Sequence, residues 1–230
     1  MKSFGIAATL GLAFTALMFG WLTGIAAAWS AAGGDIVRAS RDGAAMAASL
    51  MVGNSVQVVT LALAARMTGE DLFAYLGLDV PRRRDLIVTA AMLAVLIALG
   101  DLATLASGHD LVDAFQLDVF RSAPTGALLP LWIGIIVAAP AGEELLFRGF
   151  LFRGFIHEPR NAVPGILAIS LIFAVLHFQY DLFGKSLIFT LGVFLGFVRL
   201  WTGSTTLVIL LHMLWNLESV VETLLAMGWM

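Results

Sequence analysis

The stretch PAGEELLFRGFLFRGF, residues 140–155, places two adjacent carboxylates inside a run of apolar residues. Glu143 and Glu144 stand within a segment long enough to cross a membrane as a helix, which takes about 20 residues. An ionised side chain inside a span is unfavourable by several kcal/mol unless it faces protein or water. The two acids therefore mark a candidate functional site within an apolar helix.

The composition places the rest of the chain in the membrane as well. Of the 230 residues, 60% are hydrophobic and only 13% are charged, which is more apolar surface than a soluble domain can hide. The net charge of −3 is small and spread along the chain, so the lipid bilayer is indicated as a partner and nucleic acid is not. The chain has no cysteine, which excludes disulfides, thiolate metal sites and cysteine nucleophiles.

Seven apolar runs are long enough for membrane-spanning helices, and no strand alternation accompanies them. The sequence therefore predicts an all-α polytopic helical membrane bundle with about seven transmembrane helices, in a range of six to eight. The first run is expected to be a retained helix, because its apolar core is longer than that of a signal peptide. Without a hydrophilic domain or an internal repeat, residues 1–230 are predicted to form a single membrane domain. The seven runs are 4–29, 44–66, 86–106, 126–156, 162–180, 184–201 and 204–226.

The distribution of Lys and Arg predicts the orientation. With a cytoplasmic N-terminus, nine of the 13 Lys and Arg side chains, Lys2 included, fall on the inside. We therefore expect a cytoplasmic N-terminus, and the Ala-rich composition suits a bacterial inner membrane. Between the spans, residues 107–125 have an amphipathic character that predicts a helix lying at the membrane interface.

Helical spacing separates the charged groups of the opening stretch. Glu144 and Arg148 are four residues apart and share one helix face, whereas Glu143 is rotated by about 100°. Arg153 lies about 140° from Arg148 in a regular helix. The pattern predicts a Glu144–Arg148 pair, a Glu143 side chain that projects into a cavity, and Arg153 as an anchor that reaches the membrane surface.

Two histidines lie on other apolar runs. His177 is four residues after Phe173, and His212 is four residues before Asn216, so each pair shares a helix face. Glu143 lies as many residues before one position in the turn 157–161 as His177 lies after that position. This predicts that the two residues lie at one depth, about 25 Å from the turn. His212 is only about 13 Å beyond its own turn at 1.5 Å per residue. A tilt, a broken helix or a deeper turn is therefore needed to bring His212 to the depth of Glu143 and His177.

Three motifs in this order resemble a known family. EELLFR (143–148), FAVLH (173–177) and HMLWN (212–216) are similar to the Glu-Glu-xxx-Arg, Phe-xxx-His and His-xxx-Asn motifs of the CPBP family, the CAAX-processing and bacteriocin-processing intramembrane endopeptidases. The preceding GFVRLWTGS (196–204) is also typical. The resemblance covers about residues 125–220 as a catalytic core and leaves 1–106 as accessory N-terminal helices.

The resemblance implies hydrolysis of peptide bonds in membrane-associated protein or peptide substrates. It assigns Glu143 as the general base that activates a water, His177 and His212 as catalytic histidines, and Asn216 as a helper. Glu144, Arg148 and Phe173 would support the site. This assignment agrees with peptide hydrolysis, which needs a water that loses a proton and hydrogen-bond donors for the oxyanion.

The resemblance does not decide whether the protein uses a metal ion. His177, His212 and Glu143 match a zinc site with two histidines and one glutamate, yet a metal-free glutamate mechanism uses the same residues, and no compact His-Glu-x-x-His helix is present. If Glu143 holds zinc, Glu144 becomes the candidate base.

Two other classes of function stay open. Some relatives are non-catalytic immunity or scaffold membrane proteins, and sequence alone does not separate them from enzymes. A proton-coupled transporter could use the same Glu and His residues as a relay, but that reading predicts an inverted repeat, and the polar residues instead gather in the second half of the chain.

Overall fold

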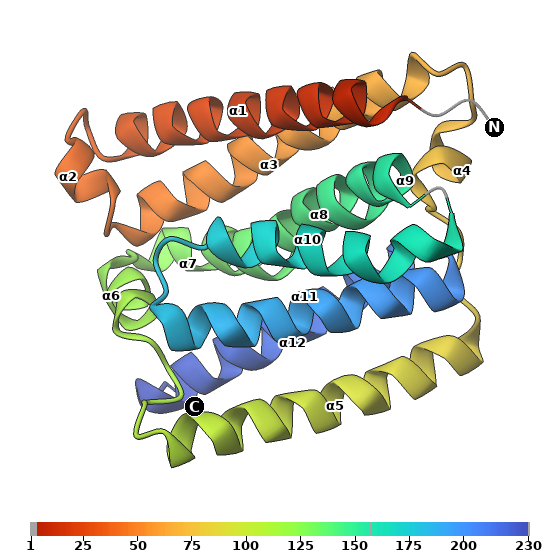
Figure 1. Cartoon of the computed structure of the whole chain (residues 1–230). Coiled ribbons are helices and arrows are strands. Elements are labelled where there is room, and N and C mark those ends of the chain that lie inside the picture. Colours follow the sequence, from red (N-terminus) through yellow and green to blue (C-terminus); the bar gives the residue numbers. More distant parts are fainter. Residues whose placement is uncertain (1–3, 157, 230) are drawn as a thin grey trace. The chain divides into compact units, whose positions relative to one another are not determined.

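The protein is built from helices, as Figure 1 shows for the computed structural model, which describes residues 4–156 and 158–229. Lys2, used in the orientation prediction, and His157, the first residue of the predicted turn 157–161, lie outside the described residues. No strand occurs in the described part of the chain. The predicted all-α membrane bundle is therefore confirmed.

Within the described residues, six helices are long and apolar enough to span a membrane. The first five elements are α1 (Ile6–Ala31), α2 (Ile36–Ala39), α3 (Gly43–Arg66), α4 (Leu72–Leu76) and α5 (Arg83–Ala106). They are followed by α6 (Ala114–Ser122) and by a continuous helical stretch, Thr125–Phe155, that contains α7 (Thr125–Ile133), α8 (Ala139–Glu144) and α9 (Phe152–Phe155). The last elements are η3 (Pro159–Asn161), α10 (Ala162–Val175), α11 (Leu182–Thr202) and α12 (Thr205–Ala226).

The fifth predicted span, 162–180, is shorter than expected. Helix α10 has 14 residues and ends at Val175, which gives it about 21 Å at 1.5 Å per residue, against a hydrocarbon core of about 30 Å. The backbone N–H of His177 donates to the Ala174 carbonyl at 3.2 Å in a turn that closes the helix. Asp181 then caps α11 by accepting from the Gly184 N–H at 2.8 Å.

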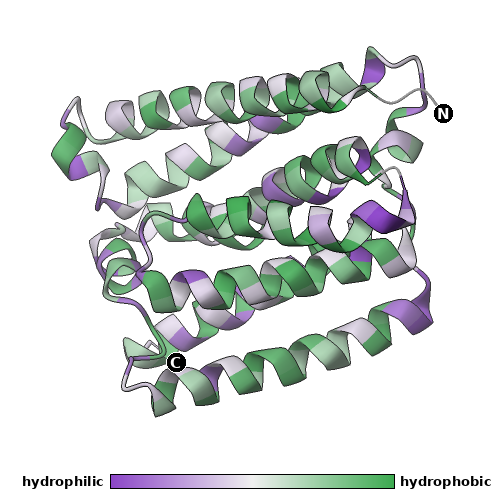
Figure 2. Cartoon of the chain, in the orientation of Figure 1, coloured by the Kyte–Doolittle hydropathy of each residue, from purple (hydrophilic) through white to green (hydrophobic). Residues whose placement is uncertain are grey.

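Most of the charged residues of α5 gather at the end of the helix where its membrane span begins. Figure 2 shows hydrophilic residues at the start of this helix and mainly apolar residues along the rest of it. The RRRD run, 82–85, therefore lies where the span begins. The predicted interfacial stretch 107–125 does contain a helix, α6.

The chain divides into two compact units. Unit 1 consists of Met1–Thr15, Leu61–Gly100 and Glu144–His212. Unit 2 consists of Ala16–Thr60, Asp101–Glu143 and Met213–Met230. The prediction of one membrane domain over residues 1–230, with a core at 125–220 and accessory helices at 1–106, stays a prediction.

Unit 1 is held together around the second half of the 125–155 helix. Helix α10 packs against α11, and α4 packs against the segment Leu145–Leu151. Arg153 forms an ion pair with Glu70 and lies over the Tyr75 ring, 4.5 Å from its centroid. Its side chain is only 13% exposed, so Arg153 ties α9 to the α3–α4 connection and does not extend as the expected surface anchor.

Unit 2 has its own apolar cores. In one of them, α6 packs with residues of α3, α7 and α12, and the fully buried Phe120 belongs to this cluster. A second cluster consists of alanines from α1, α2 and α3. Helices α1 and α3 approach closely at Gly20 and Gly53, where an added Cβ would lie 2.9 Å or less from the facing carbonyl oxygen.

Candidate functional site

The helix that carries the two acids is not regular. Two π-helical segments interrupt it, η1 (Gly134–Ala138) and η2 (Leu145–Leu151), on either side of α8 (Ala139–Glu144). A π-helix forms i→i+5 hydrogen bonds and has more residues per turn than an α-helix. The rotation of 140° predicted between Arg148 and Arg153 therefore does not apply here. Such insertions are rare and frequently occur at functional sites.

The predicted Glu144–Arg148 pair is present and buried. Glu144 is fully buried and Arg148 is 1% exposed, and the Arg148 Nη1 donates to Glu144 Oε1 at 3.0 Å. Nη2 donates to the Gly192 carbonyl at 2.8 Å, and the guanidinium lies over the Phe173 ring at 4.9 Å. Two ions so deeply buried need these additional bonds to offset the loss of water.

His212 meets the same carboxylate oxygen. Its Nδ1 lies 2.8 Å from Glu144 Oε1, and the residue is 4% exposed. Glu144 thus joins an arginine on its own helix to a histidine on α12. The other oxygen, Oε2, is buried and has no hydrogen-bond partner in the part of the chain that the structure describes.

A buried turn brings His212 to this position. Ser204 and Thr205, which begin α12, are 5% and 0% exposed, so the helix starts inside unit 1. Arg199 fixes this turn because its Nε donates to Thr205 Oγ1 at 2.9 Å and to the Arg148 carbonyl at 3.1 Å.

His177 lies just beyond the end of α10. Its Nδ1 is 2.8 Å from the Phe173 carbonyl oxygen, and the two rings meet edge to face with centroids 4.7 Å apart. The Phe173 ring also meets the His212 ring edge to face at 5.9 Å. Phe173, which is 1% exposed, therefore contacts both imidazoles and sets their spacing.

These contacts orient the two imidazole rings. A carbonyl oxygen only accepts, so Nδ1 of His177 donates to Phe173. Nδ1 of His212 lies at hydrogen-bond distance from Glu144 Oε1, the oxygen that also accepts from Arg148. Each ring is therefore held through its Nδ1.

The other two predicted residues belong to unit 2. Glu143 is half-buried and is the last residue of its segment of that unit. Asn216, also half-buried, donates from Nδ2 to the Ile135 carbonyl in η1 at 2.8 Å. Unit 1 therefore brings together Glu144, Arg148, Phe173, His177 and His212, while Glu143 and Asn216 are described with unit 2.

The sequence analysis missed a polar contact beside Glu143. Gln57, 5% exposed in α3, donates from Nε2 to the Gly142 carbonyl at 2.9 Å. An added Cβ on Gly142 would come within 2.2 Å of Asn54 Oδ1, so only glycine fits against that side chain. A search for uncharged polar residues within the 44–66 run would have found both Asn54 and Gln57, whereas our search considered ionisable residues.

The histidines of unit 1 do not complete a three-ligand metal site. Among the described residues, the one group of three His, Asp or Glu ligand atoms within 4.8 Å of one another is Asp101, Glu218 and Glu222, in unit 2. Zinc ligands usually donate their second ring nitrogen to a carboxylate or carbonyl, as His177 and His212 do. Glu143, the third ligand that the sequence predicts, is described with unit 2, so the zinc site stays a prediction and we derive no step through a metal.

The fold and these residues together define a polytopic membrane protein with a buried glutamate, arginine and histidine group. Residues 125–217 match the family model described as Rce1-like, type II CAAX prenyl endopeptidase Rce1-like. This match confirms the resemblance to CAAX-processing endopeptidases for that segment and points to intramembrane endopeptidase activity. No curated protein and no solved structure matches the chain.

Proposed function

We propose that the protein is an intramembrane endopeptidase that hydrolyses peptide bonds of membrane-associated proteins or peptides with a glutamate-activated water. The observation that carries the proposal is the Glu144 carboxylate, which binds Arg148 and His212 with one oxygen inside a fully buried environment. A buried ionic group of this kind within spans is expected at a functional site. The CAAX-endopeptidase match of residues 125–217 supplies the reaction class.

In the proposed mechanism Glu143 is the general base. It takes a proton from a water whose oxygen attacks the peptide carbonyl carbon, which gives a tetrahedral oxyanion. The oxyanion needs preorganised donors, and His177, His212 and the Asn216 amide are assigned to orient the water and supply them. The C–N bond then breaks, and the leaving amine receives the proton from Glu143.

The supporting residues act on geometry and charge. Glu144 accepts from His212 Nδ1, which orients the imidazole and fixes its tautomer, as carboxylates do for catalytic histidines. Arg148 pairs with Glu144, and Phe173 holds the two rings apart. Glu144 and Arg148 are therefore positioning residues in this proposal and do not touch the substrate.

Substrates of the CAAX-processing or bacteriocin-processing kind follow from the resemblance and the family match. We also propose an integral location in a bacterial inner membrane with a cytoplasmic N-terminus, on the Lys and Arg distribution. Because the chain has no native cysteine, single cysteines at Arg83 and Gly34 can be labelled with an impermeant thiol reagent. The proposed orientation places position 34 outside and position 83 on the cytoplasmic side, so labelling of position 83 by reagent added outside intact cells would contradict it.

The mechanism is tested with purified protein in proteoliposomes and a fluorogenic membrane peptide. Glu143→Gln should remain folded and lose turnover by roughly 10²-fold or more. Glu218→Gln, which removes an acid elsewhere in a span, is the matched control and should retain turnover. Full activity of Glu143→Gln would refute the assigned base.

The same preparation separates the alternatives. A wild-type protein that binds the peptide with no cleavage would indicate an immunity or scaffold protein, and proton-coupled uptake without cleavage would indicate a transporter. Zinc is tested by metal analysis of active protein, together with chelation: zinc at one equivalent and loss of turnover on chelation would establish a metalloprotease.

A further inference from the structure

A second site lies in unit 1 where three membrane-spanning helices begin or end. A pocket of about 550 Å³ is lined by residues 79–82, 84 and 85 of the connection into α5 and by residues 201, 202, 204 and 207 around the turn between α11 and α12. Helix α5 begins at Arg83, α11 ends at Thr202 and α12 begins at Thr205. The ends of spans lie at the headgroup region of a bilayer, so the pocket opens at that depth.

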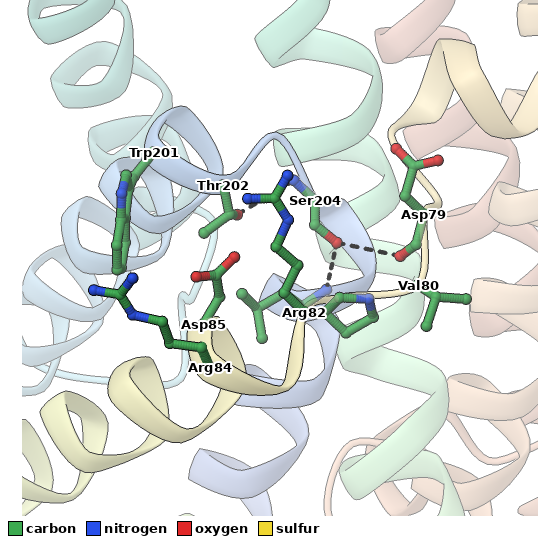
Figure 3. A pocket seen from close by; sticks show the side chains of 10 residues that line it. Asp79, Val80, Arg82, Arg84, Asp85, Trp201, Thr202 and Ser204 are labelled. Atoms are coloured by element: carbon green, nitrogen blue, oxygen red, sulfur yellow. Dashed lines mark hydrogen bonds between the residues drawn. The ribbon is translucent and has the colours of Figure 1, made fainter.

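The two walls are fixed to each other by hydrogen bonds. Thr205 N–H donates to the Gly77 carbonyl at 2.7 Å, and Ser204 Oγ donates to the Asp79 carbonyl at 3.4 Å, the bond drawn in Figure 3. Gly203 has φ +73, a left-handed conformation that glycine adopts without strain. The pocket is therefore preformed and does not depend on a ligand for its shape.

Two arginines reach into this pocket without a partner. Figure 3 shows Arg82 extending toward Thr202 and Ser204 at the turn between α11 and α12 and Arg84 extending toward Trp201 near the end of α11, with the Asp85 carboxylate between the two arginines in this view. None of these three side chains has a hydrogen bond or ion pair with another residue in the described part of the chain. The arginines inside unit 1 have partners: Arg148 and Arg153 form ion pairs, and Arg199 donates to Thr205 Oγ1 and to the Arg148 carbonyl.

The charged side chains at the pocket indicate which charged groups its ligand carries. Guanidinium groups bind phosphate with several parallel N–H donors, and Arg82 and Arg84 supply two of them. Asp85 would repel a purely anionic ligand but accepts from a primary ammonium. The second acid, Asp79, lies on the far side of the turn in Figure 3. A ligand with a phosphate and an ammonium a few bonds apart satisfies both charges.

The exposed apolar residues around the pocket indicate that this ligand is the headgroup of a lipid. Val80 at the pocket is 93% exposed and Trp201 is 59% exposed, and exposed tryptophan is enriched at membrane interfaces. From the pocket inward, Ile87 on α5 and Phe197 on α11 are 57% and 42% exposed. The two helices stay together further along, since Gly100 lies beside Leu187. Acyl chains can follow these apolar side chains.

We propose that this pocket binds the headgroup of a glycerophospholipid that joins a phosphate to a primary ammonium, as in phosphatidylethanolamine. The phosphate binds Arg82 and Arg84, and the ammonium donates to Asp85. The site is separate from the proposed peptidase residues and does not rest on their activity.

The test measures binding of defined lipids to the purified full chain in detergent, by native mass spectrometry and by the lipid-dependent shift in melting temperature. Phosphatidylethanolamine should bind more tightly than phosphatidylcholine, whose quaternary ammonium has no N–H donor, and more tightly than phosphatidylglycerol, which has no cation. Equal binding of the three lipids to wild-type protein would overturn the proposal without any variant.

Variants then assign the residues. Arg82→Gln with Arg84→Gln should weaken phosphatidylethanolamine binding by roughly tenfold or more, while melting without lipid stays unchanged because both side chains are exposed and unpaired. Arg83→Gln, within the same run but outside the pocket lining, is the matched control. Asp85→Asn should abolish the preference for ethanolamine over choline.

Two further outcomes count against the site. If Arg83→Gln weakens binding as much as the double variant, the effect comes from general surface charge. If soluble glycerophosphoethanolamine stabilises the protein as well as the lipid does at equal concentration, the ligand is a free phosphate compound and the lipid assignment is wrong.

Discussion

Glu144 and His212 are 68 residues apart in the sequence, and a 2.8 Å contact joins Glu144 Oε1 to His212 Nδ1 in the buried interior of unit 1. The same oxygen accepts from Arg148 at 3.0 Å. One carboxylate oxygen therefore connects the Glu-Glu-xxx-Arg and His-xxx-Asn motifs. We interpret this contact as the link that orients His212 for the proposed reaction.

The first prediction concerns coupling between these two residues. His212→Gln should lower kcat by roughly 10²-fold, and Glu144→Gln should lower kcat with little change in KM, because it acts on the orientation of His212. The double variant should be no worse than His212→Gln alone, since residues that act as a unit are not additive. Independent, multiplicative losses would contradict the positioning role.

The second prediction concerns the stability of the buried pair. Arg148→Met leaves the buried Glu144 with His212 but without its arginine partner, and loss of one member of a buried ion pair should lower the free energy of unfolding by about 3–5 kcal/mol. Glu144→Gln combined with Arg148→Met removes both charges and should recover part of that loss. Thermal melting in detergent measures the series, and an unchanged melting temperature for Arg148→Met would argue against a structural pair.

The helices could be predicted from the sequence because a membrane span requires a long apolar run. The run 44–66, for example, became α3 at Gly43–Arg66, and the Glu144–Arg148 pair followed from a separation of four residues. The π segment Leu145–Leu151 could not be predicted, since a shift from i+4 to i+5 hydrogen bonding leaves no mark in the pattern of residue types. The early end of α10 was missed because Leu176 and Phe178 continue the apolar run past Val175.

The contact between His212 and Glu144 also could not be predicted from the sequence. It depends on the turn at Ser204 and Thr205, which is buried and is held in place by Arg199. Counting residues along a helix does not show that the turn before it is buried within the protein. The roles of Glu143 and Asn216 remain predictions that rest on the motifs.

The third prediction tests the close approach beside Glu143. Gly142→Ala would place a Cβ 2.2 Å from Asn54 Oδ1, and overpacking of this kind lowers stability by about 1–3 kcal/mol. We expect lower thermal stability and lower turnover, because Glu143 is the next residue. Asn54→Ala in the same chain should restore part of both. Gly126→Ala, where the added Cβ meets nothing within 4 Å, is the control and should be neutral or stabilising.

The last prediction concerns pH and the start of α3, where Asp42 caps the helix. Its Oδ1 accepts from the Ala44 and Ala45 N–H groups at 2.9 and 3.0 Å, and Oδ2 accepts from Arg38 Nε at 3.2 Å. Burial alone would raise the pKa of this carboxyl, but the hydrogen bonds from Ala45, Arg38 and Ala44 outweigh burial and hold the pKa below its ordinary value.

A lowered pKa in the folded protein means that the ionised form contributes stability above the ordinary value of about 3.9, and that this contribution is lost as the pH falls through the folded pKa. Wild-type protein should therefore lose thermal stability in acid more steeply than Asp42→Asn, which still caps the helix but does not titrate. Asp42→Ala should lower stability by about 1 kcal/mol at neutral pH. Parallel melting curves for wild type and Asp42→Asn between about pH 2 and 6 would show that this carboxylate does not contribute to the acid sensitivity of the fold, because its protonation would then leave the balance between folded and unfolded chains unchanged.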